Sequence, residues 1–483
     1  MSQVVLQNFI AGRWVGSKST TLLDVENPAD NSVLARVPVS TPEEVDEAVR
    51  AAQDAFRDWR EVPPPDRVQC LFRLKGLLDQ QHAEELAVTI TKENGKILSE
   101  ARGEVLRTVQ NVETACGASM LMQGRTLQQI SRGIDESAER VPLGVFAVIP
   151  PFNFPAMVPS WFWPYAVACG NAAIVKPSEQ VPLTSQRLFE LIEQAGFLPG
   201  VLSLVHGHRA VSEALISHPG IVGVSSVTST PTARVIYRLA AEQGKRVQCG
   251  AGAKNFVVVM PDADLDQAVP NIMDSVYGTA GQRCLAGANV VAVGGVAEQL
   301  VPALVEAASS LVVGNGLDEG VDMGPLISRA AKARVIAEIG RGVAEGGKLL
   351  LDGRSAAVPE QGNFLGPSIF DDVRPEMTIA CEELFGPVMT ILRARTVEQA
   401  VDMVNASRYG NAAVIYTQSG KAAREFARGV DTGMVGVNVG PAAPMAFFPF
   451  GGRKESFFGV LHGQAQDAVD FFTDKKIVIQ RWW

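Results

Sequence analysis

Two short segments contain residue types that act together in chemistry on a carbonyl group. Cys284 follows a run of small residues, Gly278-Thr279-Ala280-Gly281, and Asn153 is the centre of Pro151-Phe152-Asn153-Phe154-Pro155. A thiolate that attacks an aldehyde produces a tetrahedral oxyanion, which is stabilised by aimed donors such as an amide side chain and a backbone N–H. We therefore expect Cys284 to be the nucleophile, with Asn153 and the N–H of Cys284 as oxyanion donors. The alternatives are a buried structural thiol and an asparagine that fixes a turn.

Length and composition are those of a multidomain globular enzyme. The 483 residues exceed what one hydrophobic core usually serves, which favours two or three domains. A net charge of −9 disfavours a nucleic-acid groove, because phosphate binding needs clustered Lys and Arg. The N-terminus lacks the pattern of a signal peptide, so a cytoplasmic location is expected. The six cysteines have no metal-ligand spacing, and neither a metal site nor disulfides are expected.

Short β-branched runs alternate with helical patterns along the chain. Thr41-Pro42-Glu43-Glu44 has the hydroxyl cap, first-turn proline and reciprocal glutamate of a helix start. Runs such as 145–149, 172–175, 201–205 and 256–259 are typical of buried strands. The alternation predicts a doubly wound α/β fold built on parallel sheet.

Three further motifs follow one another in order along the chain. They are Lys176-Pro177-Ser178-Glu179, Glu383-Leu384-Phe385-Gly386-Pro387 and Pro449-Phe450-Gly451-Gly452. Together with the Asn153 and Cys284 segments, they resemble the aldehyde dehydrogenase superfamily nearly end to end. A closer resemblance, to its CoA-acylating methylmalonate-semialdehyde dehydrogenases, is carried by Pro151 to Met157, Gly252-Ala253-Lys254-Asn255, Ala280 to Cys284, Ser456-Phe457-Phe458-Gly459 and Gln480-Arg481-Trp482.

The resemblance implies an aldehyde dehydrogenase-like architecture with three parts. A Rossmann-like NAD-binding domain would take residues 1–119 and 142–252, and an α/β catalytic domain would take residues 253–465. A small β oligomerisation flap would combine residues 120–141 and 466–483, which implies a homodimer or homotetramer. No Gly-x-Gly-x-x-Gly fingerprint opens a helix, so the dinucleotide site rests on the resemblance.

The resemblance also assigns the residues that would hold NAD. They are Phe152, Lys176, Glu179, Ser229, Thr230, Glu383 and Phe385. The charge of Glu179 would repel a 2′-phosphate, so NAD is expected in preference to NADP. The alternatives are a solvated surface for Lys176 and Glu179, and an ordinary core position for Phe385. Thr228 and Ala233 replace glycines that are usual in the superfamily, which puts cofactor affinity in question.

The residue at position 250 bears on the fate of the acyl group. Hydrolytic aldehyde dehydrogenases carry a glutamate four residues before the lysine that corresponds to Lys254, and this chain has Gly250 there. Glycine cannot activate water, so the resemblance implies that coenzyme A, a better nucleophile, takes the acyl group as co-substrate. The alternative is that glycine suits a turn and that another group serves as the base.

Two arginines match positions that hold the substrate carboxylate in this branch. Arg107 and Arg283 can each bind a carboxylate bidentately. Arg283 also offers a cation that would favour the Cys284 thiolate. The alternatives are a surface arginine at 107 and a structural anchor at 283. Arg453, next to Gly452, is expected to add a charge at the mouth of the substrate site.

The resulting hypothesis is an enzyme that uses NAD to oxidise a small aldehyde, malonate or methylmalonate semialdehyde. A thioacyl group on Cys284 would lose CO2 and pass to CoA, giving acetyl-CoA or propionyl-CoA. One alternative is a hydrolytic NAD-dependent dehydrogenase of another aldehyde. Another is a catalytically impaired relative with a non-enzymatic role, for which Thr228 and Ala233 are the support.

Overall fold

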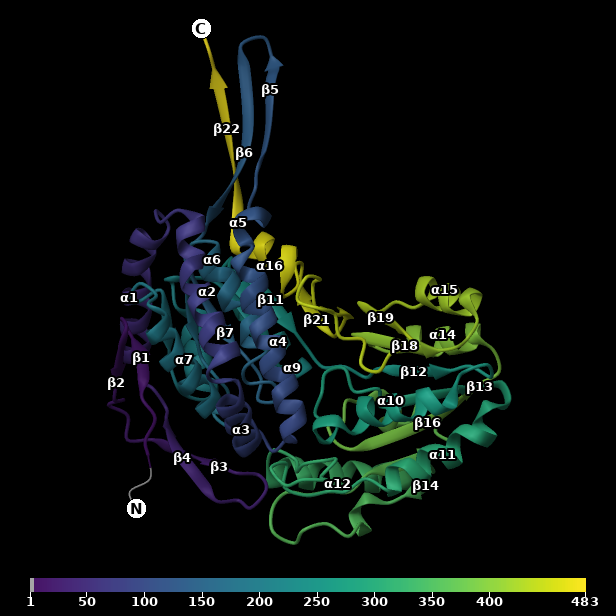
Figure 1. Cartoon of the computed structure of the whole chain (residues 1–483). Helices are drawn as coiled ribbons and strands as arrows, with labels where there is room; N and C mark the ends of the chain where they lie inside the picture. Colours follow the sequence, from purple (N-terminus) through teal and green to yellow (C-terminus); the bar gives the residue numbers. More distant parts are fainter. Residues whose placement is uncertain (1–3) are drawn as a thin grey trace.

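Two β-sheets of mostly parallel strands form the framework of the molecule (Figure 1). The computed structural model describes residues 4–483. The first sheet has eight strands in the order β2 (Arg13–Val15), β1 (Asn8–Ile10), β9 (Leu202–Leu204), β8 (Ala172–Val175), β7 (Val145–Ile149), β10 (Ile221–Val227), β11 (Arg246–Gly250) and β21 (Phe457–Gly459). The predicted doubly wound α/β architecture is confirmed.

Helices cover both faces of the first sheet because its central strands are apolar on both sides. Phe146 and Val148 of β7 face one core, whereas Val145, Ala147 and Ile149 face the other. The first core packs against α2 (Pro64–Gln80), α3 (Ala83–Asn94), α4 (Leu98–Cys116), α6 (Trp163–Ala168), α7 (Pro182–Ala195) and α16 (Ala465–Phe472). The second core packs against α1 (Pro42–Trp59), α8 (Arg209–Ser217) and α9 (Thr230–Ala241). A continuous apolar strand between two helical layers is what a buried parallel sheet requires.

The helix start predicted at Thr41 is confirmed in detail. The Thr41 hydroxyl accepts from the N–H of Glu44 at 3.3 Å, and the Glu44 carboxylate accepts from the N–H of Thr41 at 2.8 Å. This reciprocal pair satisfies two N–H groups that the first turn of α1 leaves without partners.

The strand order of the first sheet reverses at β7. The chain runs outward from β7 through β8 to β9, and then returns to the other side of β7 with β10 and β11. In open parallel sheets, ligands bind where the order reverses, outside the carboxyl ends of the strands. The segments that follow β7 and β10 contain Asn153 and Ser229 respectively.

The second sheet has seven strands, and helices cover it as well. Its order is β14 (Lys348–Leu351), β15 (Ser368–Asp371), β16 (Val388–Ala394), β13 (Asn289–Val293), β12 (Phe256–Val259), β18 (Ala412–Tyr416) and β19 (Met434–Val437). Its core includes side chains of α10 (Leu265–Tyr277), α11 (Ala297–Ser309), α12 (Arg329–Ala344), α14 (Val397–Ala406) and α15 (Gly420–Gly429). The two sheets lie in separate lobes, with α4 on the side of the first lobe that faces the second (Figure 1).

A three-stranded antiparallel sheet projects from the first lobe, with the C-terminus at its tip (Figure 1). It consists of β22 (Thr473–Arg481), β6 (Ile134–Pro142) and β5 (Arg125–Ser131). Smaller elements are β3 (Leu22–Glu26) paired with β4 (Val33–Pro38), β17 (Tyr409–Gly410) paired with β20 (Arg453–Lys454), α5 (Ala118–Leu121) and α13 (Thr378–Cys381). The domain limits drawn from the sequence stay a prediction, and β21 from the C-terminal part extends the first sheet.

Between residues 4 and 483, none of the helices has the length and apolar character needed to cross a membrane.

Candidate active site

The structure brings the two predicted reactive segments together between the lobes. Asn153 follows β7 at the carboxyl edge of the first sheet, and Cys284 precedes β13 at the amino edge of the second. The Asn153 amide donates to the carbonyl of Gln282 at 2.9 Å. This bond orients the amide with its NH2 group toward the Cys284 turn, and the second hydrogen of that group stays available.

The turn before Cys284 is held in a strained conformation. Thr279 and Ala280 both have φ of 52°, a left-handed conformation that costs a non-glycine residue about 1–3 kcal/mol. The N–H of Thr279 donates to Glu100 Oε1 at 2.7 Å, which ties the turn to α4. Gly281 has φ of 71°, and a Cβ there would meet the backbone of Gly386. The Cys284 turn and the Glu383–Pro387 segment are therefore in close contact.

The backbone of Cys284 is anchored through its carbonyl and not through its N–H. The amides of Asn255 and Asn411 donate to the Cys284 carbonyl at 2.9 and 2.8 Å. Across residues 4–483, no carbonyl or side-chain oxygen accepts from the Cys284 N–H. That N–H is thus available as the second donor to an oxyanion.

The environment of Cys284 disfavours its thiolate. Burial raises the pKa of the Cys284 thiol to about 12, and the negative charge of Glu383 adds to this effect. Arg283 opposes the shift only weakly, because its charge is shared with two carboxylates. Arg283 does favour the thiolate, as expected, but burial and Glu383 outweigh it in the free protein.

The free protein should therefore be alkylated slowly at Cys284 near neutral pH. Only the thiolate reacts, so the iodoacetamide rate should rise about tenfold per pH unit from pH 7 to pH 10 without a plateau. Glu383→Gln removes a negative charge and should speed the reaction at each pH. Mass analysis of the Cys284 peptide over time gives the rate, and a plateau reached by pH 9 would contradict the raised pKa.

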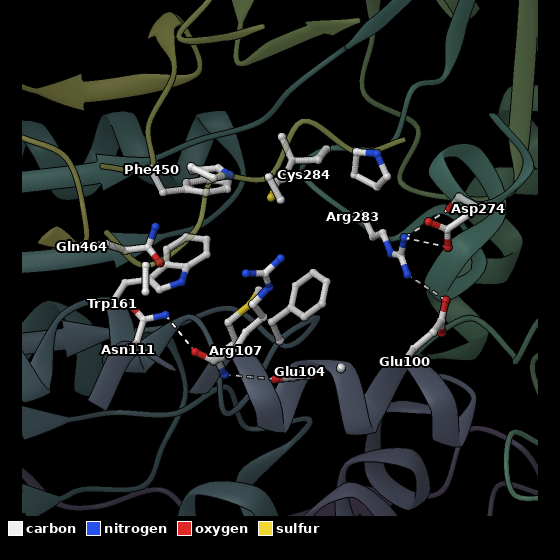
Figure 2. A pocket seen from close by; sticks show the side chains of 18 of the residues that line it. Glu100, Glu104, Arg107, Asn111, Trp161, Asp274, Arg283, Cys284, Phe450 and Gln464 are labelled. Carbon is white, nitrogen blue, oxygen red and sulfur yellow. Dashed lines mark hydrogen bonds and ion pairs between the residues drawn. The ribbon is translucent and has the colours of Figure 1, made fainter. Parts of the chain in front are cut away.

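A pocket of about 490 Å³ opens in front of Cys284 on the α4 side (Figure 2). Its apolar wall includes Trp161 and Phe450, whose rings stack with centroids 4.2 Å apart. Arg107 reaches into this pocket from α4 and bonds to Gln110 and to the sulfur of Met445. Within residues 4–483, Arg107 makes no ion pair, so its charge is available to an anionic ligand.

Arg283 lines the same pocket but is engaged elsewhere. Its guanidinium pairs with Glu100 at 2.9 Å and with Asp274 at 3.4 Å, and in Figure 2 it points toward these two carboxylates. To bind a substrate carboxylate, Arg283 would have to exchange these partners. Its role as a second carboxylate ligand stays a prediction.

The expectation for Arg453 is wrong. Arg453 does not line the pocket in front of Cys284, and its guanidinium pairs with Asp431 at 3.0 Å. The residue begins β20, where it lies opposite Gly410 of β17.

A second pocket, of about 580 Å³, reaches Cys284 from the first sheet. It lies at the carboxyl ends of β7, β8 and β10, where the strand order reverses. Its lining contains all but one of the predicted cofactor residues, namely Phe152, Lys176, Glu179, Ser229, Glu383 and Phe385. The remaining one, Thr230, lies beneath it and accepts from the N–H of Gly252 at 3.0 Å.

The second pocket has a Lys176–Glu179 pair at one end and the carboxyl group of Glu383 at the other. The buried Lys176 donates to the carbonyl of Gly207 at 2.8 Å and lies 3.6 Å from the partly exposed carboxylate of Glu179. At the other end, Glu383 accepts from the N–H of Ala253 at 2.9 Å, and burial raises its pKa to about 7. Because Lys176 is buried, the alternative of a solvated surface at this residue is excluded.

Glycine and aromatic residues shape the end of this pocket next to Cys284. Phe385 meets Phe152 edge to face, with ring centroids 5.7 Å apart. A Cβ on Gly252 would come within 2.7 Å of Glu383, so only glycine leaves that space open. Thr228 lines the pocket, whereas Ala233 belongs to α9 and is buried in the core that this helix covers. Of the two departures from the usual glycines, only Thr228 therefore lines this pocket.

The environment of Gly250 contains no acid. Gly250 lines a small space together with Cys284, Trp161, Phe162 and Asn411, and none of the lining residues carries a carboxylate. Val227 is 3.1 Å from the position of a Cβ on Gly250. Water in this space would find no general base.

Comparisons with known proteins agree with this geometry. Residues 14–478 match the model of the aldehyde dehydrogenase family. The chain belongs to the aldehyde dehydrogenase family. It is 51% identical over 477 residues to malonate-semialdehyde dehydrogenase 2 of Geobacillus thermodenitrificans, with 99% of each chain covered. Malonate-semialdehyde dehydrogenase of Halalkalibacterium halodurans is 47% identical, with 99% of this chain and 98% of that protein covered.

Solved structures of this family superpose closely. A crystal structure from Sinorhizobium meliloti 1021, assigned as methylmalonate-semialdehyde dehydrogenase and complexed with NAD, has a TM-score of 0.98 and 40% identity. It covers 100% of this aldehyde dehydrogenase and 99% of its own chain. Methylmalonate-semialdehyde dehydrogenase from Oceanimonas doudoroffii has a TM-score of 0.97 and 41% identity, covering 99% and 98%. The predicted family and fold are confirmed.

The sequence reasoning missed several residues of the site. Lys96, Glu100 and Glu104 contact the two reactive segments of this aldehyde dehydrogenase, and Trp161 walls the substrate-side pocket. One signal was present: Glu100, Glu104 and Arg107 recur at helical spacing, which places polar groups on the α4 face that meets the pocket.

Proposed function

We propose that this aldehyde dehydrogenase oxidises malonate or methylmalonate semialdehyde with NAD and transfers the acyl group to CoA. The observation that carries the proposal is that Cys284 lines two pockets at once, one containing Arg107 and the other following the strand-order reversal. The first suits a small aldehyde that carries a carboxylate, and the second suits a dinucleotide. The names of its relatives support the same substrates.

The residues of the second pocket fit NAD. Lys176 and Glu179 would hold the adenosine ribose, and the carboxylate of Glu179 would repel a 2′-phosphate. Ser229 and Thr230 begin α9, whose first-turn N–H groups suit the pyrophosphate. Glu383 would hold the nicotinamide ribose, and Phe152 and Phe385 would flank the ring. When bound there, NAD supplies the acceptor for the hydride of the aldehyde.

The residues around Cys284 would carry the carbon chemistry. After its proton has passed to water, Cys284 adds to the aldehyde carbon as the thiolate, and the oxyanion that forms accepts from the Asn153 amide and the Cys284 N–H. Loss of hydride leaves a thioester on Cys284. With a carboxylate β to the thioester carbonyl, C–C cleavage releases CO2, because the carbonyl accepts the electron pair, and the carbanion takes a proton.

The acyl acceptor would be the CoA thiol. With Gly250 where hydrolytic relatives carry a glutamate, and no carboxylate around it, water is a poor competitor. The CoA thiol is largely protonated at neutral pH, but its thiolate is a far better nucleophile toward a thioester than water is. The products would be acetyl-CoA or propionyl-CoA.

One observation favours a second candidate, a hydrolytic dehydrogenase. Glu383 lines the dinucleotide pocket together with Cys284, and its pKa of about 7 suits a general base at neutral pH. In this candidate Glu383 would activate water after the reduced cofactor has left. Product analysis distinguishes the two candidates, because only the hydrolytic enzyme releases a free acid.

Replacing Arg107 should separate carboxylated from uncharged substrates. Arg107→Leu removes a charge-assisted pair that contributes about 1.5–3 kcal/mol, so KM for malonate semialdehyde should rise roughly tenfold or more. KM for propanal should hardly change, because propanal has no carboxylate. The matched control is Arg102→Leu on the solvent side of α4, where Arg102 pairs with Glu84. Equal losses for both substrates would show that Arg107 supports the fold instead.

The projecting sheet of β22, β6 and β5 is proposed as the assembly surface of a homodimer or homotetramer. Its strands expose the apolar side chains of Leu127, Ile130, Ile477 and Ile479, with Trp482 just beyond β22. Exposed apolar strands in a small sheet are typical of subunit contacts.

A further inference from the structure

Three side chains hold the segment that carries Asn153. The Asn94 amide donates to the carbonyl of Phe152 at 3.0 Å, and Lys96 Nζ donates to the carbonyl of Asn153 itself at 2.6 Å. Glu104 Oε1 accepts from the N–H of Ala156 at 2.8 Å and of Met157 at 3.2 Å. Four residues of this segment, Phe152, Asn153, Ala156 and Met157, are thus held by side chains from positions 94–104.

Lys96 and Glu104 form an ion pair that is completely removed from solvent. Their charged groups lie 2.6 Å apart, with side-chain exposures of 0% for both. The ammonium of Lys96 also lies 3.9 Å from the centre of the Phe154 ring. Buried pairs of this kind often add little to stability, because desolvation offsets their attraction. Their contacts here all go to one reactive segment, which indicates a purpose other than stability.

Residues 94–104 also contact the turn that precedes Cys284. Glu100, one helical turn before Glu104, accepts from the N–H of Thr279 at 2.7 Å. Figure 2 shows Glu100, Glu104 and Arg107 along one helix beside the pocket. Side chains from positions 94–104 therefore contact both the Asn153 segment and the Cys284 turn, although Asn153 and Cys284 belong to different lobes.

We propose that Lys96 and Glu104 are positioning residues for oxyanion stabilisation and act through Asn153. Lys96 fixes the backbone of Asn153, Glu104 fixes the next turn of chain, and together they aim the amide at the carbonyl oxygen of the substrate. A displacement of about 1 Å in such a donor can cost about 100-fold in rate. This inference rests on the proposed function, and it goes further by assigning two residues that act through the Asn153 segment.

A double-mutant cycle tests the proposal. Lys96→Met and Asn153→Ala are made singly and together, and the rate of the first NADH turnover with malonate semialdehyde is measured by rapid mixing. Lys96→Met should slow this step about 10-fold to 100-fold when Asn153 is present, and by less than about threefold when Asn153 is already alanine. The melting temperature should fall equally in both backgrounds, since burial of Lys96 is the same in each.

Two further variants serve as a replacement for Lys96→Met, if that protein does not fold, and as a control. If Lys96→Met leaves the Glu104 charge unpaired and does not fold, Lys96→Met with Glu104→Gln removes both charges and retains an acceptor for the Ala156 N–H. Arg102→Met, which breaks the exposed pair of Arg102 with Glu84 on the same helices, is the control and should leave the rate unchanged.

The possible failures can be told apart. Equal rate losses in both Asn153 backgrounds, or no loss with Asn153 present, would overturn the positioning role while the proposed function stands. A wild-type protein that forms no NADH from any aldehyde would overturn the proposed function and the positioning role with it.

Discussion

Cys284→Ala is expected to form no NADH from any aldehyde while keeping its fold. Among residues 4–483, Cys284 is the only thiol that lines both the substrate-side and the dinucleotide pocket. Alanine keeps the Cβ and removes only the sulfur, and the backbone stays anchored by Asn255 and Asn411 at the carbonyl. Without a nucleophile no tetrahedral adduct can form, so hydride transfer has no starting point. NADH absorbance and a melting curve on the same sample measure the two properties.

The control for this substitution is Cys381→Ala. Cys381 is the other thiol that is partly exposed, it lines neither pocket, and its sulfur contacts the carbonyl of Pro375. Its replacement should leave NADH formation near the wild-type rate. Measurable turnover by a folded Cys284→Ala protein would remove Cys284 from the mechanism.

Asn153→Ala is expected to slow the first turnover of NADH by about 100-fold or more. The amide is held toward the Cys284 turn by its bond to the Gln282 carbonyl, and its second hydrogen is placed for an oxyanion. Its loss removes a preorganised donor from a buried site, where water cannot replace it. Aldehyde binding should change much less than the rate, because the donor acts on charge that develops during the reaction.

Asn153→Asp tests whether the N–H donor of Asn153, and not the shape of its side chain, is needed. Aspartate has the same shape as asparagine, but it lacks the N–H donor and brings a negative charge toward the oxyanion. The loss of rate should be at least as large as for alanine, with the same retention of fold. A loss below about fivefold for either variant would make Asn153 a turn residue only.

The sequence predicted which segments react because strand ends are recognisable. Asn153, Lys176 and Ser229 each follow an apolar run that forms a parallel strand, and parallel strands align their carboxyl ends at one edge. These short motifs therefore predicted both the parallel sheet and the side of the site that lies at its carboxyl edge. Their resemblance to a known family supplied the partner segment at Cys284.

The rest of the site depends on contacts that no local pattern encodes. Glu100 meets Arg283 across 183 positions of sequence, and this ion pair occupies the guanidinium that the sequence offered to Cys284 or to a substrate carboxylate. Lys96 meets Asn153 across 57 positions, again through a side chain with no motif of its own. Periodicity placed Glu100 and Glu104 on a helix face, but only the packed structure shows what that face touches.

The proposed transfer to CoA is the central claim, and one rapid-mixing experiment tests it most directly. Wild-type protein is mixed with malonate semialdehyde and NAD, and NADH is followed from the first turnover. Without CoA we expect a burst of about one NADH per active site and then a slow steady rate, because hydride transfer precedes a stalled deacylation.

The same experiment with CoA completes the test. Added CoA should raise the steady rate and yield acetyl-CoA, identified by its mass, in the same amount as the NADH formed. A steady rate that does not respond to CoA, with a free acid as the only product, would contradict the account. It would return the protein to hydrolytic chemistry with Glu383 as the candidate base.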